Sequence, residues 1–78
     1  LSAPGTELIS VSIPSDAGVV GMRLEDVELP PHSFISLVIK KGGASLPTDG
    51  LVLEADDELV AVTMTGDEQT LYDILTGV

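Results

Sequence analysis

Three consecutive acidic residues, Asp56, Asp57 and Glu58, stand directly before an apolar run at 59–64. Carboxylate oxygens bind Ca²⁺, but a calcium-binding loop spaces its acids at alternating positions around a glycine and adds a distant glutamate. Consecutive side chains of an extended segment point to opposite sides, so one such segment does not gather three carboxylates around one ion. The pattern therefore favours a turn that leads into a strand. As metal ligands, these three residues are candidates in a dimer that joins carboxylates from two chains.

The two adjacent lysines are the candidate contacts for an anionic ligand. Lys40 and Lys41 stand at a predicted hairpin, where lysines usually protect the edge of a sheet. Because the chain has only three Lys and Arg residues in total, these two are still the first candidates for touching an anion. They close a segment that begins with Phe34 and Ile35. We therefore expect a ligand, where one binds, along Phe34 to Lys41 at a symmetric interface.

No catalytic arrangement stands out in the sequence. His32 is the single histidine and lies in a proline-bounded loop, which favours a surface position. Ser33 beside it is not a nucleophile for this base, because adjacent residues rarely present both side chains to one reacting atom. Walker, GxGxxG and HExxH motifs are absent, so ATP hydrolysis, dinucleotide binding and zinc proteolysis lack their required residues. We predict a protein without enzymatic activity; the alternative is a small acidic enzyme domain that uses the acids with His32.

Charge and size narrow the remaining classes. The net charge is −10, and nucleic-acid binding needs Lys and Arg side chains to neutralise phosphates, so a nucleic-acid partner is excluded. A chain of 78 residues holds one domain with a small core. No apolar run approaches the ~20 residues of a membrane helix, and no signal-peptide pattern opens the chain. With no cysteine, these features lead us to expect a cytoplasmic protein without membrane insertion.

Alternation and turn residues predict a sheet. The segment ELISVSI alternates apolar and serine residues, which is typical of a half-buried strand, and Pro14 ends it. The segment 34–40 is apolar at nearly every position and predicts a central strand that is buried on both faces. Glycines 42 and 43 then supply a hairpin turn to a short return strand. A last strand, again buried on two faces, covers 59–64.

Two short helices are expected beside this sheet. The segment MRLEDVEL spaces its apolar residues roughly helically over 22–29 and is closed by two prolines. Asp67 can cap a second helix, which Gly77 closes. Two short helices cover only one face of a sheet, so the two-sided strands need a second cover. A partner subunit is the obvious candidate.

We therefore expect an α+β domain with a small sheet of four to five strands and two short helices, in the order β-α-β-β-β-α. It should form a homodimer whose interface uses a strand face. Residues 1–6 are expected to form a linker tail and residues 7–78 the domain. The core and the interface should be supplied by Leu8, Ile9, Val11, Ile13, Leu24, Val27, Phe34, Leu37, Ile39, Leu59, Val60, Val62, Leu71, Ile74 and Leu75.

Three segments, taken in order and spacing, resemble the RCK C-terminal domain, also called the TrkA-C domain. LPTDGLVLEADDELVAV resembles the family's closing pattern P…L..GD.L.V.G, and AGVVGMRLEDVELP resembles s.lvGktL.el.lp, with Gly21, Leu24 and Leu29 in matching places. FISLVIKKGG resembles v.vvaivRgg, with Lys41 where arginine is usual. Asp56 replaces the family's glycine before the aspartate, and aspartate tolerates left-handed backbone geometry better than most residues.

The resemblance implies an RCK_C-like regulatory module, cytosolic and non-catalytic, in a potassium or other cation transport system. Its implied partner is a membrane transporter or channel subunit. A cyclic dinucleotide is the implied ligand, although LPPHSFI lacks the basic residue and the asparagine of the versions that bind cyclic di-AMP. A cation is favoured instead by the thirteen acids, and a purely structural dimerisation domain without ligand is the third possibility. The sequence points to no particular cofactor.

Overall fold

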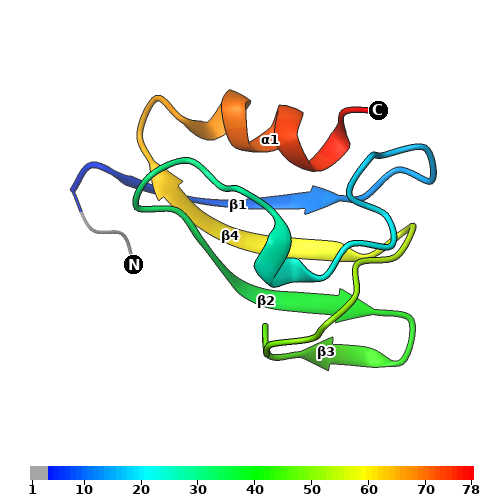
Figure 1. The fold of residues 1–78 in the computed structure, drawn as a ribbon. Helices are drawn as coiled ribbons and strands as arrows, with labels where there is room; N and C mark the ends of the chain where they lie inside the picture. The colour runs from blue at the N-terminus through cyan, green and yellow to red at the C-terminus, as the bar shows by residue number, and fades with distance from the viewer. Residues whose placement is uncertain (1–3) are drawn as a thin grey trace.

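The computed structural model describes residues 4–78. Within this range the chain forms β1 (Thr6–Ser12), a 3₁₀ turn η1 (Leu24–Asp26), β2 (Phe34–Lys40), β3 (Gly43–Ser45), β4 (Glu58–Met64) and the helix α1 (Glu68–Thr76). The four strands make one antiparallel sheet in the order β1-β4-β2-β3, with α1 lying over β1 and β4 (Figure 1). The expected α+β class and the central place of strand 34–40 are confirmed.

The hydrophobic core lies on the face of the sheet that α1 covers. Leu71 and Leu75 of α1 are fully buried there against the strands. The loop after β1 and the segment before β4 close the rest of this core, with Val19 and Leu53 buried in it. The core also contains residues that the alternation did not single out: Ala17, Val19, Ile35, Val38, Leu53 and Ala61.

The opposite face of the sheet, here called the open face, is apolar and uncovered. Leu8 pairs with Val62, which pairs in turn with Phe34, so the three side chains form one row across the sheet. Leu8 is 66% exposed and Phe34 55% exposed. Alternation along the strands places further residues on the same face: Ser10, Ser12, Leu37, Ile39, Glu58, Val60 and Met64.

A bulge explains how β2 supplies apolar side chains to both faces. The register of β2 against β4 shifts between Ile35 and Leu37, so Ser36 is the extra residue of the bulge. Its hydroxyl donates to the carbonyl oxygen of Val60 at 3.0 Å. As a result Ile35 and Val38 are buried in the core, whereas Phe34 lies on the open face. β2 was predicted to be buried on both faces. Within one chain, only its core face is buried.

The prediction of a helix over 22–29 was wrong. Residues 4–78 contain one α-helix, where two were predicted. Only the turn η1 forms over 22–29, with no side-chain cap at its start. The backbone bonds instead to a distant segment: Leu24 N donates to Leu51 O at 2.8 Å and Leu53 N to Met22 O at 2.9 Å. A helix of two turns is costly to nucleate, and the extended pairing satisfies the same backbone groups.

The predicted boundary between the tail 1–6 and the domain 7–78 stays a prediction. Residues 1–3 of the predicted tail 1–6 lie outside the described residues, and Thr6 already belongs to β1. The second predicted helix is confirmed as α1, with Asp67 at its N-cap position and Gly77 at its C-cap. The side chain of Asp67 makes no capping hydrogen bond. The backbone nitrogen of Gly77 donates the last helical hydrogen bond, to Asp73 O at 2.9 Å, and the extended backbone of Gly77 (φ −67°, ψ 146°) ends the helix.

Candidate functional site

The segment 54–57 is a tight turn that leads into β4, as the acidic pattern predicted. Asp57 N donates to Glu54 O at 3.2 Å and closes the turn. Asp56 adopts a φ of 70°, the left-handed conformation that its place in the family pattern led us to expect. The turn is joined to the end of β1, because Asp56 N donates to Ile13 O and Ile13 N donates to Asp57 O, both at 2.8 Å.

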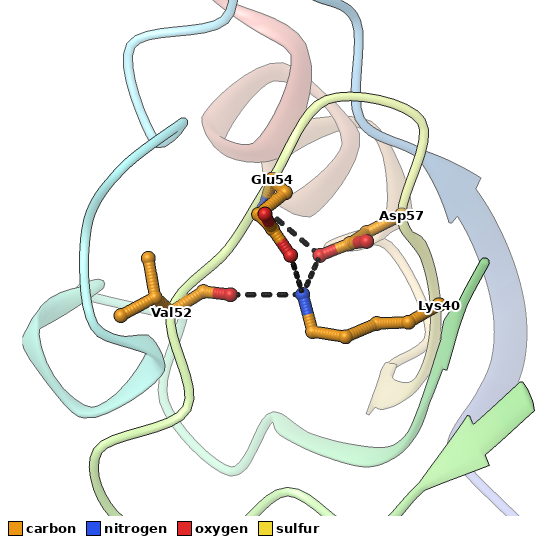
Figure 2. Close-up of polar contacts among 4 residues, drawn as sticks. All are labelled: Lys40, Val52, Glu54 and Asp57. Carbon is orange, nitrogen blue, oxygen red and sulfur yellow. Dashed lines mark hydrogen bonds and ion pairs between the residues drawn. The ribbon is translucent and has the colours of Figure 1, made fainter. Parts of the chain in front are cut away.

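Lys40 reaches from the end of β2 into this turn (Figure 2). Its Nζ lies 2.6 Å from Asp57 Oδ2, 3.0 Å from Glu54 Oε1 and 2.9 Å from the carbonyl oxygen of Val52. The topology accounts for the contact, since β2 and β4 are antiparallel neighbours and the end of one meets the start of the other. The residues are 17 positions apart in the sequence but adjacent across the sheet.

Asp57 is the buried member of this ion pair. Its residue is 4% exposed, and its Oδ2 also accepts a hydrogen bond from Glu54 N at 2.9 Å. The Lys40 side chain is 23% exposed and that of Glu54 is 70% exposed. A buried carboxylate is stable only when it is paired and hydrogen-bonded, and Lys40 with the turn backbone meets both needs. The pair therefore stabilises the entry to β4.

The electrostatics keep Lys40 charged. Burial by itself lowers the pKa of Lys40, but the hydrogen bonds that Lys40 donates to Asp57 and then to Glu54, together with the attraction of their charges, outweigh it. The net effect raises the pKa of Lys40 above its usual 10.5. Lys40 is therefore an ammonium ion throughout the physiological pH range. Its charge is already neutralised by the protein, so it is not a free anion-binding group.

A surface depression of about 540 Å³ surrounds the ion pair. It brings together both predicted anion-binding lysines, Lys40 and Lys41, and all three predicted metal ligands. Carboxylates outnumber ammonium groups in its lining. The complete lining is Ile39, Lys40, Lys41, Glu54, Ala55, Asp56, Asp57 and Glu58.

Phe34 and Ile35, the other predicted ligand contacts, do not line this depression. They lie at the start of β2, and an extended strand rises ~3.3 Å per residue, which places Phe34 about 20 Å from Lys40. Ile35 is 7% exposed in the core, and Phe34 lies on the open face. The predicted ligand contacts form one continuous segment, but its first two residues lie on the open face and in the core, whereas its two lysines line the depression.

The predicted metal ligands are separated by their hydrogen bonds. Asp57 faces Lys40, Glu58 accepts the Ser10 hydroxyl, and Asp56 is exposed. Among residues 4–78, no group of three His, Cys, Asp or Glu side chains is placed to hold a metal ion. Metal binding by these acids stays a prediction, and it requires carboxylates from two chains.

The enzyme alternative finds no support in the local geometry. His32 is exposed with a φ of 62°, and its neighbour Ser33 bonds to the buried Thr63 hydroxyl at 2.7 Å.

Sequence reasoning missed the roles of Glu54 and of the Val52 carbonyl in the Lys40 contact. A signal was present: with so few cations, a buried aspartate beside the end of a lysine-bearing strand has few other partners.

These observations define a small α+β domain with an open apolar sheet face and a structural ion pair. The family model of the TrkA-C domain matches residues 8–76, so the chain belongs to the TrkA-C domain family. This is the RCK C-terminal family, which is found in potassium transport regulators. Comparison with curated proteins finds no match. Within residues 4–78, each helix is too short or too polar to span a membrane.

Proposed function

We propose that this domain is a dimerising regulatory module of a cation transport system. The family supplies the regulatory role, and the open face is the observation that supports dimerisation. The open face presents apolar side chains from all three long strands, with Leu8 and Phe34 largely exposed. A contiguous apolar patch of this kind on a small domain marks an interaction site.

The charge distribution favours a second copy of the chain as the occupant. The sequence has thirteen acids and a net charge of −10, so two copies repel one another over most of their surfaces. Among the described strand residues placed on the open face, one is charged: Glu58, which lies at the start of β4 between Ser12 and Ile39. It is therefore the surface on which two copies approach with the least repulsion. Face-to-face packing of two sheets about a two-fold axis buries both apolar faces.

Dimerisation gives the module a way to regulate a transporter. An event that favours one arrangement of the two subunits shifts the population of the pair. A transport protein attached to the pair responds to that shift if its own conformational states bind the two subunit arrangements with different affinities. The module thus works at the cytoplasmic side of a membrane transporter or channel subunit without contacting lipid or nucleic acid.

The dimer is tested by replacing Val62, at the centre of the open face, with glutamate. We expect wild-type protein to sediment as an assembly and Val62→Glu at micromolar concentration to have half its mass, because the charge would be buried between sheets. Val20→Glu is the matched control, since Val20 is 37% exposed and lies in the loop after β1. A wild-type protein that sediments as a monomer would contradict the proposal.

Ligand sensing at the depression around Lys40 is a second candidate, and the favoured ligand is a cation held between the acids of two subunits, because within residues 4–78 the acids of one chain are not placed to bind it alone. The lining holds four carboxylates against two ammonium groups, and Lys40 is neutralised internally. Calorimetric titration should give heat with Ca²⁺ that is lost in Asp56→Asn and kept in Glu28→Asn, an exposed acid elsewhere. Cyclic di-AMP, an anion, should give none. Absence of heat with both ligands at submillimolar concentration leaves dimerisation as the sole role.

A further inference from the structure

The two edges of the sheet are protected very differently. β3 is one edge strand, and it has three residues that are followed closely by Pro47. β1 is the other edge, with seven residues, no proline, no lysine and a single charge at Glu7. Natural sheets protect exposed edges by shortness, proline, lysine or a bulge. β1 has none of these features, which identifies its outer edge as a pairing surface.

The hydrogen bonds at both ends of β1 show which backbone groups face outward. Ile13 N donates to Asp57 O and Thr65 N donates to Gly5 O, both at 2.8 Å. An antiparallel ladder alternates between residues bonded to the neighbour and residues turned away from it. The odd-numbered residues of β1 therefore bond to β4. Leu8, Ser10 and Ser12 turn their N–H and C=O groups away from β4, and all three residues are exposed.

We propose that the outer edge of β1 pairs with β1 of a second copy in antiparallel fashion, which joins two sheets into one. The register that uses the outward groups of Leu8, Ser10 and Ser12 places Ser10 opposite Ser10 of the second copy and Leu8 opposite Ser12. Each such pair exchanges two backbone hydrogen bonds. The same register places Glu7 opposite Ile13 of the second copy, so the two Glu7 carboxylates lie at opposite ends of the contact.

This edge contact is separate from the face-to-face contact of the proposed function. The edge contact uses backbone groups in the plane of the sheet, whereas the face contact uses side chains perpendicular to it. The two contacts therefore have perpendicular two-fold axes, and where these axes intersect the two contacts produce a closed tetramer, a dimer of dimers. A second copy is the favoured strand donor, because two face-to-face pairs that meet can form two edge contacts, and the second of these forms within the same assembly.

Substitution at Ser10 tests the edge contact. Proline there removes an outward N–H and leaves the ladder to β4 intact, since proline is tolerated on the free side of an edge strand. Sedimentation should show that Ser10→Pro halves the mass of the wild-type assembly. Ser10→Ala keeps the N–H and removes the hydroxyl bond to Glu58, so this matched control should keep the wild-type mass. The pair of variants separates the backbone contact from the side-chain contact.

Hydrogen exchange of the wild-type protein gives an independent measurement that needs no variant. Amides of Leu8, Ser10 and Ser12 should become protected as protein concentration rises. An unchanged mass in Ser10→Pro together with rapid exchange of these amides at all concentrations overturns the edge contact. If the face contact alone fails, Val62→Glu keeps the wild-type mass while Ser10→Pro yields a monomer. If the edge contact alone fails, Ser10→Pro keeps the wild-type mass while Val62→Glu yields a monomer.

Discussion

Replacing Asp57 with alanine should lower the free energy of unfolding by about 3 kcal/mol. The substitution leaves the Lys40 ammonium in a poorly solvated place with only the exposed Glu54 carboxylate and the Val52 carbonyl as partners. It also removes the acceptor that holds Glu54 N at the start of the turn. Urea denaturation measured by circular dichroism gives the change directly.

Two comparison variants identify the buried pair as the cause. Glu54→Ala also removes a carboxylate from Lys40, but that side chain is 70% exposed, so the loss should stay below about 1 kcal/mol. The double variant with Lys40→Met and Asp57→Ala removes both charges. It should be more stable than Asp57→Ala alone, because no half-buried ammonium ion is left without its buried partner. Lys40→Met alone completes the cycle, and a double variant whose cost equals the sum of the two single costs would show that the ion pair has no energetic coupling.

The same pair sets a pH dependence with a defined sign. A group whose pKa is raised on folding binds its proton more tightly in the folded state, so it stabilises the protein wherever it is protonated. The pKa of Lys40 is raised above 10.5, so its contribution is complete below that pH and is lost as the pH rises through the folded value. The Lys40→Met variant should lack this alkaline loss, and Lys41→Met should keep it.

The parts of the fold that follow local rules were predictable from the sequence. Strand 34–40 and strand 59–64 are marked by continuous apolar runs, and α1 is marked by its spacing and by Gly77. The prediction of a helix over 22–29 was wrong because helical spacing of apolar residues over so short a segment contributes little free energy to helix formation. Its backbone instead pairs with 51–53, a contact between distant segments that no local pattern reveals. The bulge at Ser36 is likewise a product of register and not of composition.

The candidate site was predictable as a set of residues but not as an arrangement. The acids at 56–58 and the lysines at 40–41 were identified separately, as a cation site and an anion site. The antiparallel order of β2 and β4 brings them into one depression, where Lys40 and Asp57 neutralise each other. Hydrophobic periodicity identifies strands but does not say which strands are neighbours in the sheet, so the contact between the two groups could not be predicted.

Leu71→Ala should also cost about 3 kcal/mol of unfolding free energy, because it removes the fully buried anchor of α1. A helix of nine residues is too short to be stable alone in water, so α1 depends on the contacts of Leu71 and Leu75 with β1 and β4. Thermal unfolding followed by circular dichroism measures the loss. Tyr72→Ala, on the next residue and 49% exposed, is the matched control and should cost less than about 1 kcal/mol.

The size of the domain makes the Leu71 substitution severe. Small domains have total stabilities of about 5 kcal/mol, so losing about 3 removes more than half of the margin. The helix and the sheet share one core, and we therefore expect their signals to be lost together in one transition at a lower temperature. Because the open face does not depend on α1, a Leu71→Ala protein that is still folded should keep the mass of the wild-type assembly. Loss of the assembly in a folded Leu71→Ala protein would show instead that α1 takes part in the contact between copies.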